Sequence, residues 1–263
     1  MPDWIKKRVL ITVRTYPLPS VKSVEASCTA GITEDGKWIR LYRVPSRMLS
    51  DAQQFKKYQW ITVEVTKARK DFRPESYNPR LDQIQVGEVL PTTADWHSRW
   101  SFVRPLVAPS MCSIQRERDQ HGYPTLGIFK PREITRLVIE DSEPDWTPKQ
   151  QASLNQGLLF EAGPAKKLEK IPFNFKYEFR CADPACGGHK MTCTDWEMAE
   201  AYRSWRQRYK EGWKAAFRNK FENEMAQKFD THFFVGNQHQ APTAWIIVGL
   251  FYPPRREPDL FSK

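Results

Sequence analysis

The chain has 263 residues, of which 40% are hydrophobic and 13% aromatic, so it can bury a sizeable core and is not a disordered polypeptide. Lys and Arg outnumber Asp and Glu by 41 to 31, and the formal charge of +10 favours a polyanionic partner such as DNA or RNA. The longest apolar run, residues 244–252, is too short to cross a bilayer, and the first residues lack the apolar core of a signal peptide. We therefore expect a cytoplasmic protein with no membrane partner and with reduced cysteines.

The first half of the chain is predicted to be rich in β-structure. Asp35-Gly36 is typical of a tight hairpin turn, because such a turn needs positive φ at its centre. Short, closely spaced strands favour a small barrel or a strongly bent sheet, of OB-like or PUA-like size, over residues 1–141. Segments rich in β-branched and aromatic residues predict strands at residues 8–14, 23–32, 37–44, 58–68, 81–90 and 134–140.

A polar, proline-bearing stretch at residues 140–148 marks a candidate domain boundary. Directly after it, Thr147 is suited to cap a helix, Pro148 to occupy its first position, and Gln150 to complete a capping box. We expect a short helix that ends near Phe160. This helix would lie in a linker that covers residues 142–170.

Residues 171–263 are predicted to form an α+β module. A strand at residues 173–180 leads into a cysteine-bearing stretch, and Thr194 to Glu197 form a capping box that begins a helix. Apolar residues at helical spacing predict a second helix after it, and two strands joined through residues 240–243 close the chain. The predicted fold class is therefore α+β: a small β-barrel-like module followed by a zinc-clipped α+β module with two helices and a C-terminal β-hairpin.

The stretch CADPACGGHKMTCTDWE, residues 181–197, contains three of the five cysteines. Three thiolates and one imidazole are a familiar set of ligands for a structural zinc ion, which prefers four N or S ligands in a tetrahedron. The alternative is that these residues are reduced, partly buried thiols in an irregular loop, because cysteine often behaves as a small hydrophobe. The spacing C-x4-C-x2-H-x3-C predicts a structural zinc site with the ligands Cys181, Cys186, His189 and Cys193.

Carboxylates beside a metal and a histidine could also hold a second ion or activate water, as in a metal-dependent nuclease. The candidate catalytic residues are Asp195, Glu197, His232 and His239, with Asp71 and Glu75 as a separate acidic option. Helix capping explains the first two acids equally well. The two histidines are seven residues apart, and along a straight strand this odd separation sends them to opposite faces. Whether the protein is an enzyme therefore stays open.

Alternation along the strands at residues 37–44 and 58–68 puts aliphatic residues on one face and aromatic or basic residues on the other. If the aliphatic face is the core, the opposite face is an outward platform on which bases can stack. The alternative is that this second face is also buried, under the helix near residues 148–160 or the C-terminal module. The predicted nucleic-acid-binding residues lie on this platform and in the basic loop after it: Trp38, Arg40, Tyr42, Trp60, Lys67, Arg69, Lys70 and Arg73.

Two pairs of sequence blocks resemble an uncharacterised family of prokaryotic proteins. They are CTAGITEDGKWIRLYRVPSRML with DFRPES, and CADPACGGH…DWE with HFFVGNQH…IIVGLFYPP, and together they span most of the chain. The resemblance implies a prokaryotic source and carries no activity, ligand or catalytic residue. It also leaves the fourth metal ligand open, since Cys193 is not a fixed feature of that family.

Three hypotheses for the function follow from these patterns. The leading one is a protein that binds DNA or RNA through a basic and aromatic surface and contains a structural zinc ion. The second is a metal-dependent nuclease or a related phosphate-processing enzyme. The third is an adaptor whose aromatic face binds a protein partner.

Overall fold

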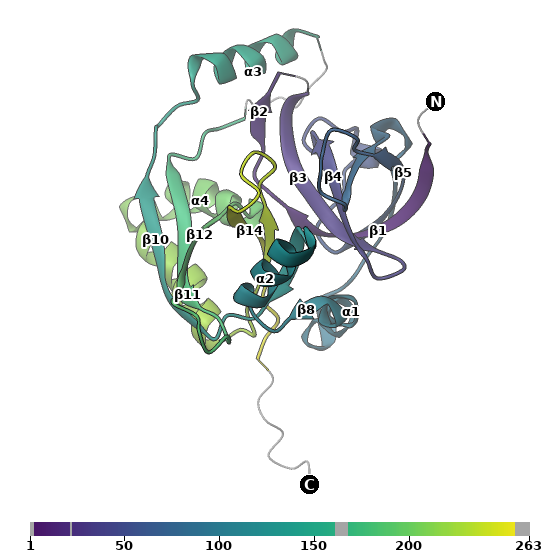
Figure 1. Ribbon diagram of the computed structural model, residues 1–263. Helices are drawn as coiled ribbons and strands as arrows, with labels where there is room; N and C mark the ends of the chain where they lie inside the picture. Colours follow the sequence, from purple (N-terminus) through teal and green to yellow (C-terminus); the bar gives the residue numbers. More distant parts are fainter. Residues whose placement is uncertain (1–2, 22, 161–167, 256–263) are drawn as a thin grey trace.

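The computed structural model describes residues 3–21, 23–160 and 168–255 (Figure 1). Within these ranges the chain forms two β-sheets with helices packed against both, so the predicted α+β class is confirmed. Each of the six segments expected to be strands contains one. Figure 1 shows the first sheet, in purple and blue, beside the second sheet, in teal to yellow.

The first sheet closes on itself as a five-stranded barrel. Because β1 pairs with both β3 and β5, the strand order β1-β3-β4-β6-β5 returns to its start. Gly31 allows this closure, since a Cβ atom there would lie 2.2 Å from the carbonyl oxygen of Leu10. The barrel strands are β1 (Ile5–Arg14), β3 (Val24–Thr33), β4 (Trp38–Val44), β5 (Gln59–Lys67) and β6 (Ser76–Pro79), and β2 (Leu18–Ser20) and β7 (Gln85–Val89) extend it.

The interior of the barrel is filled by the aliphatic face that the alternation predicts. Gly36, with φ +75°, forms the expected tight turn between β3 and β4. The buried residues inside the barrel include Val9, Ile11, Ile39, Leu41, Ile61, Val63 and Val65.

The face of the barrel strands that points away from this interior is not open to solvent along its length.

The second sheet has the strand order β10-β11-β12-β14-β13-β9-β8. Its terminal hairpin of β13 and β14 confirms the two strands expected at the end of the chain. Residues 107–141 were expected in the barrel-like module, but their strands belong to this sheet because β10 pairs along its whole length with β11. The strands are β8 (Val107–Ala108), β9 (Leu126–Phe129), β10 (Glu133–Asp141), β11 (Phe173–Arg180), β12 (His189–Cys193), β13 (His232–Asn237) and β14 (Trp245–Phe251).

The sequence patterns predicted some of the helices but not α1 or α2. The side chain of Asp195, one residue after the expected cap, accepts a hydrogen bond from the N–H of Glu197 at the start of α4. The expected cap of α3 is present, since the N–H of Gln150 donates to the Thr147 hydroxyl. The helices are α1 (Thr93–Val103), α2 (Met111–His121), α3 (Pro148–Phe160), α4 (Trp196–Tyr209), α5 (Trp213–Arg218) and α6 (Met225–Gln227), with a π-helical turn at Asn219–Glu224 and 3-10 turns at Asp51–Gln53, Leu81–Gln83, Arg104–Leu106 and Lys210–Gly212. In the described part of the chain, none of these helices is long and apolar enough to span a bilayer.

The hairpin of β13 and β14 lies between the barrel and the helices. Successive strand residues point to opposite faces, so Phe233 packs in the helix-side core and Phe234 in the barrel-side core. On the helix side, the ring of Phe217 stacks on Phe175 with centroids 4.6 Å apart. Burial on both faces explains why HFFVGN and WIIVGLF are almost continuously apolar.

A buried lysine joins the two modules. Nζ of Lys57, which precedes β5, lies 3.1 Å from Oδ2 of Asp195 and 3.3 Å from Oε1 of Glu197, at the start of α4. The Lys57 and Asp195 side chains are 7% and 0% exposed. Burial disfavours the lysine's charge, but the two carboxylates overcome this effect and raise the pKa of Lys57. Asp195 also accepts a hydrogen bond of 2.9 Å from the N–H of Leu250 in β14.

We predict that Lys57→Met lowers the free energy of unfolding by about 3–5 kcal/mol, because it leaves the Asp195 carboxylate buried without its counter-charge. The double variant Lys57→Met/Asp195→Asn removes that charge and retains a cap for α4, so it should recover part of the loss. Urea unfolding of the three proteins measures both effects. A Lys57→Met change below about 1 kcal/mol would show that the ion pair does not hold the modules together.

Candidate functional site: a metal centre and a basic groove

Four potential metal ligands converge in the second module. The ligand atoms of Cys112, Cys181, Cys186 and His189 all lie within 4.8 Å of one another. Sγ of Cys112 is 3.5 Å from Sγ of Cys181 and 3.5 Å from Nε2 of His189. Three thiols and an imidazole at this spacing could hold a metal ion.

Three elements bring these residues together. Cys112 lies in the first turn of α2, and the capping box of Ser110 with Ser113 fixes the direction of that helix. Cys181 follows the last residue of β11, and His189 is the first residue of β12. The ring of His189 stacks on Phe179 with centroids 5.0 Å apart, which orients the imidazole.

The loop between β11 and β12 is shaped to turn its donors inward. Asp183 accepts hydrogen bonds from the N–H groups of Ala185 and Cys186, and Gly188 has φ +99°. Nη2 of Arg116 on α2 lies 2.6 Å from Oδ2 of Asp183 and so ties the loop to that helix. Sγ of Cys186 accepts weak hydrogen bonds from the N–H groups of Cys181 and Gly188, which hold this sulfur on the inner side of the loop.

The thiols of the cluster influence one another's charge. Burial opposes ionisation of Cys181, but hydrogen bonds from the backbone of Cys112 and Asp183 and from His189 lower its pKa to about 6. Burial and the neighbouring Cys181 raise the pKa of Cys112 to about 12. Cys181 therefore ionises readily, whereas the ionisation of Cys112 is opposed. A bound cation would stabilise both thiolates.

Cys193 was predicted as the fourth ligand, and this prediction is wrong. Residues 189–193 form strand β12, in which four residues span about 13 Å, so Cys193 cannot reach the ion that His189 would bind. Its side chain is 5% exposed and packs in the apolar core of the second module. The missed ligand, Cys112, lies 69 residues before Cys181, in a helix that the sequence patterns did not predict.

A basic groove of about 1180 Å³ lies between the barrel and the hairpin of β13 and β14. Its walls come from β4, from the end of β5 with the loop after it, from residues 237–240 at the end of β13 and after it, and from the first part of β14. Among the predicted nucleic-acid-binding residues, six line this groove: Arg40, Tyr42, Lys67, Arg69, Lys70 and Arg73.

Two of these arginines are buried and hold the modules together. Arg40, 2% exposed, donates from Nη2 to the carbonyl of Thr125 at 3.0 Å, and Gly236 leaves room for its guanidinium group. Arg73 forms an ion pair of 2.6 Å with Asp71 and donates to the carbonyl of Asn237 at 3.0 Å. Although burial opposes ionisation of Asp71, Arg73 holds the pKa of that carboxyl well below its usual range.

The predicted aromatic platform does not exist as an outward surface. Trp60 is 4% exposed because Phe102 and Arg8 pack against its ring, with the Phe102 centroid at 5.2 Å. Trp38 is half-buried and contacts Phe234 of the second module edge-on. Tyr42 is exposed, at 41%. The second face of these strands is therefore mostly an inner surface, as in the alternative that the sequence left open.

The candidate catalytic residues do not share one site. Asp195 and Glu197 bind Lys57, and Asp195 is buried. His232 is buried against Trp100, and this burial lowers its pKa, whereas His239 pairs with Asp71 at the groove.

Asp71 and Glu75, the separate acidic candidates, also form structural contacts. Glu75, 4% exposed, accepts hydrogen bonds from the N–H and hydroxyl groups of Thr125 at 2.8 and 2.6 Å. Asp71 is neutralised by Arg73. Neither carboxylate is therefore available to form a metal-binding pair with the other.

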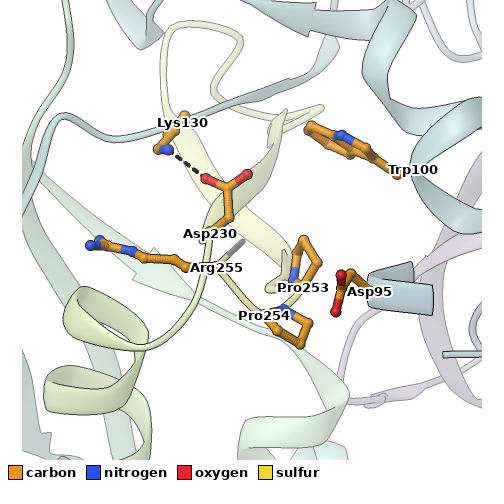
Figure 2. A pocket seen from close by; sticks show the side chains of 7 residues that line it. All are labelled: Asp95, Trp100, Lys130, Asp230, Pro253, Pro254 and Arg255. Atoms are coloured by element: carbon orange, nitrogen blue, oxygen red, sulfur yellow. Dashed lines mark ion pairs between the residues drawn. The ribbon is translucent and has the colours of Figure 1, made fainter. Parts of the chain in front are cut away.

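A smaller pocket of about 440 Å³ lies beside the end of β14 (Figure 2). Figure 2 shows Lys130 directed at Asp230, with which it forms an ion pair. Arg255 donates to the carbonyl oxygens of Phe229 and Ala226 at 3.0 and 2.6 Å. Arg255 therefore fastens the segment after β14 to the helical side of the module.

Comparison with protein families gives two matches. Residues 107–263 match the family described as Domain of unknown function (DUF8757), and residues 5–105 match Domain of unknown function (DUF8758). The chain therefore belongs to the DUF8757 family, whose match covers more than half of it, and the expected membership of an uncharacterised family is confirmed. The division between the two matches falls where the second sheet begins, at β8. No curated protein matches the chain.

We predict that the purified protein holds about one equivalent of a transition metal and that Cys112→Ser removes most of it, because a closed tetrahedral site needs all four ligands. Cys193→Ser is the matched control and should retain the metal, since Cys193 lies outside the cluster. Elemental analysis of the three proteins measures this. Equal metal content in the two variants would contradict the assignment of Cys112.

Proposed function

We propose that the protein binds nucleic acid, DNA or RNA, in the basic groove, and that a structural zinc ion at the Cys112 cluster stabilises the second module. The observation that carries the first part is the charge of the groove lining. Asp71 is the one carboxylate among the described lining residues, and Arg73 neutralises it. Six basic side chains line the groove: Arg40, Arg43, Lys67, Arg69, Lys70 and Arg73.

The basic residues are divided between the floor and the rim of the groove. Arg40 and Arg73 are buried and engaged in hydrogen bonds, whereas Arg43, Arg69 and Lys70 are exposed. Exposed cations can contact phosphates and release their counterions, which gives affinity without sequence preference. A concave wall of one charge also concentrates the field and speeds the association of a polyanion.

Zinc is the metal that suits the cluster best. Thiolates are soft ligands that select zinc, Cu(I) or iron–sulfur clusters, and one imidazole with three thiolates forms a closed tetrahedral set for zinc. Such a site leaves no position for a substrate. Its contribution is to fasten α2, β11 and β12, and the binding energy becomes folding energy.

We predict that Arg69→Glu/Lys70→Glu weakens binding of short labelled DNA or RNA by at least about tenfold and reduces the slope of log K against log salt by roughly 1.5, because two phosphate contacts are lost. Arg208→Glu/Lys210→Glu makes the same change of charge at exposed residues outside the groove and should have a smaller effect. Fluorescence anisotropy at two salt concentrations measures both. An affinity weaker than about 10 μM for all strands, or no salt dependence, would overturn the proposed function.

We predict that a strong chelator lowers the midpoint of thermal unfolding by roughly 10 °C, which corresponds to about 4 kcal/mol for a chain of this size. Added Zn²⁺ should restore the midpoint and Mg²⁺ should not, because thiolates bind magnesium poorly. Cys28 lies outside the cluster, so Cys28→Ser should respond to the chelator as the unaltered protein does. A midpoint that the chelator leaves unchanged would exclude a structural metal.

A further inference from the structure

The floor of the basic groove differs chemically from its rim. The rim is exposed and cationic, whereas the floor contains Asn237 and Val248, each 2% exposed, and the buried Arg40. A site that only holds phosphates needs exposed charges and gains nothing from a buried amide beside an aliphatic wall. The floor is therefore suited to an uncharged part of the ligand.

Two residues of this floor each carry one buried polar atom that has no partner within the described structure. These atoms are Oδ1 of Asn237 and Nε of Arg40. The rest of each side chain is held in place: Nδ2 of Asn237 donates to the carbonyl of Pro242 at 3.1 Å, and Nη2 of Arg40 donates to that of Thr125 at 3.0 Å. A buried acceptor and a buried donor are thus fixed at the groove with their hydrogen-bonding capacity unused, which is costly unless a ligand completes them.

Apolar and aromatic groups accompany these two atoms. Ile246 and Val248 line the groove on the side of β14. His239 also lines the groove, and its ring stacks on the neighbouring Phe72, with centroids 5.5 Å apart and planes 19° from parallel; Phe72 is 52% exposed. Flat rings on a basic rim are the platform on which an unpaired base stacks.

We propose that the groove binds single-stranded nucleic acid with one base turned inward, so that the Watson–Crick edge of this base meets Asn237 and Arg40 while the rim holds the phosphates. This inference rests on the proposed function and narrows its ligand to an unpaired strand. Oδ1 of Asn237 accepts from an N–H of the base edge, and Nε–H of Arg40 donates to an oxygen or ring nitrogen beside it. The volume of about 1180 Å³ exceeds what one small ligand needs and leaves room for neighbouring nucleotides.

The same geometry disfavours a duplex. In a base pair the Watson–Crick edge is already hydrogen-bonded, and both faces of the base are stacked on their neighbours. Such a base can reach a buried amide only if it leaves the helix, which costs unpairing and unstacking energy. A single strand does not incur this cost, so the groove should prefer it in both DNA and RNA.

The test compares an intact single strand, the matching duplex and an abasic strand of the same length, each as DNA and as RNA. The intact strand should bind roughly tenfold more tightly than the abasic strand, which keeps every phosphate but lacks the ring that stacks and bonds. It should also bind more tightly than the duplex. Equal affinity of the protein for all three would overturn the inference while leaving nucleic-acid binding in place, whereas no binding of any strand would overturn the proposed function itself.

Two variants test whether residues at the groove cause the tighter binding of the intact strand. Asn237→Ala and the exposed Phe72→Ala should each weaken binding of the intact strand about fivefold to tenfold and leave the abasic strand unchanged. Arg69→Glu/Lys70→Glu is the matched control and should weaken both strands equally. A misfolded variant would also lose both, so the selective loss identifies base recognition. If both alanine variants bind the intact strand as the unaltered protein does, the inward base is excluded.

Discussion

The docking of the barrel against the second sheet is the constraint on which the rest of the molecule depends. Three buried charged groups of the first module form hydrogen bonds or an ion pair with the second. Lys57 meets Asp195, Glu75 accepts two hydrogen bonds from Thr125, and Arg73 donates to the backbone of Asn237. Removing one partner would leave the other buried and uncompensated, so the modules are held in one relative position as well as packed through an apolar surface.

The groove is a consequence of this docking. Beside the apolar contact of Trp38 with Phe234, the end of β13 and the first residues of β14 form one wall of the groove. The arginines nearest to the junction serve the fold, and the cations farther out remain exposed. The four potential metal ligands lie elsewhere, where α2 meets the loop between β11 and β12, and the ion pair of Arg116 with Asp183 joins these two elements. The potential metal site is thus separate from the proposed binding surface.

Local patterns predicted much of the fold, because strand alternation and helix capping depend on residues that are close in sequence. The six strand segments, the turn at Gly36 and the aliphatic barrel interior follow from such patterns. The same patterns identified Cys181, Cys186 and His189, which lie in one short loop. They could not exclude Cys193, since the strand that carries it away from the cluster is stabilised by pairing with β11, and they could not include Cys112.

The sequence by itself determined the α+β class, the positive charge and three of the four potential metal ligands. Only the tertiary structure decided which strand faces are buried, because the outer face of Trp60 and Arg40 is covered by residues from distant parts of the chain, Phe102 and Thr125. It also decided that Asp195 is an interior ion-pair partner and that Asn237 lines the basic groove. Alternation shows that a strand has two faces, but what covers each face is set by long-range packing, which no local pattern encodes.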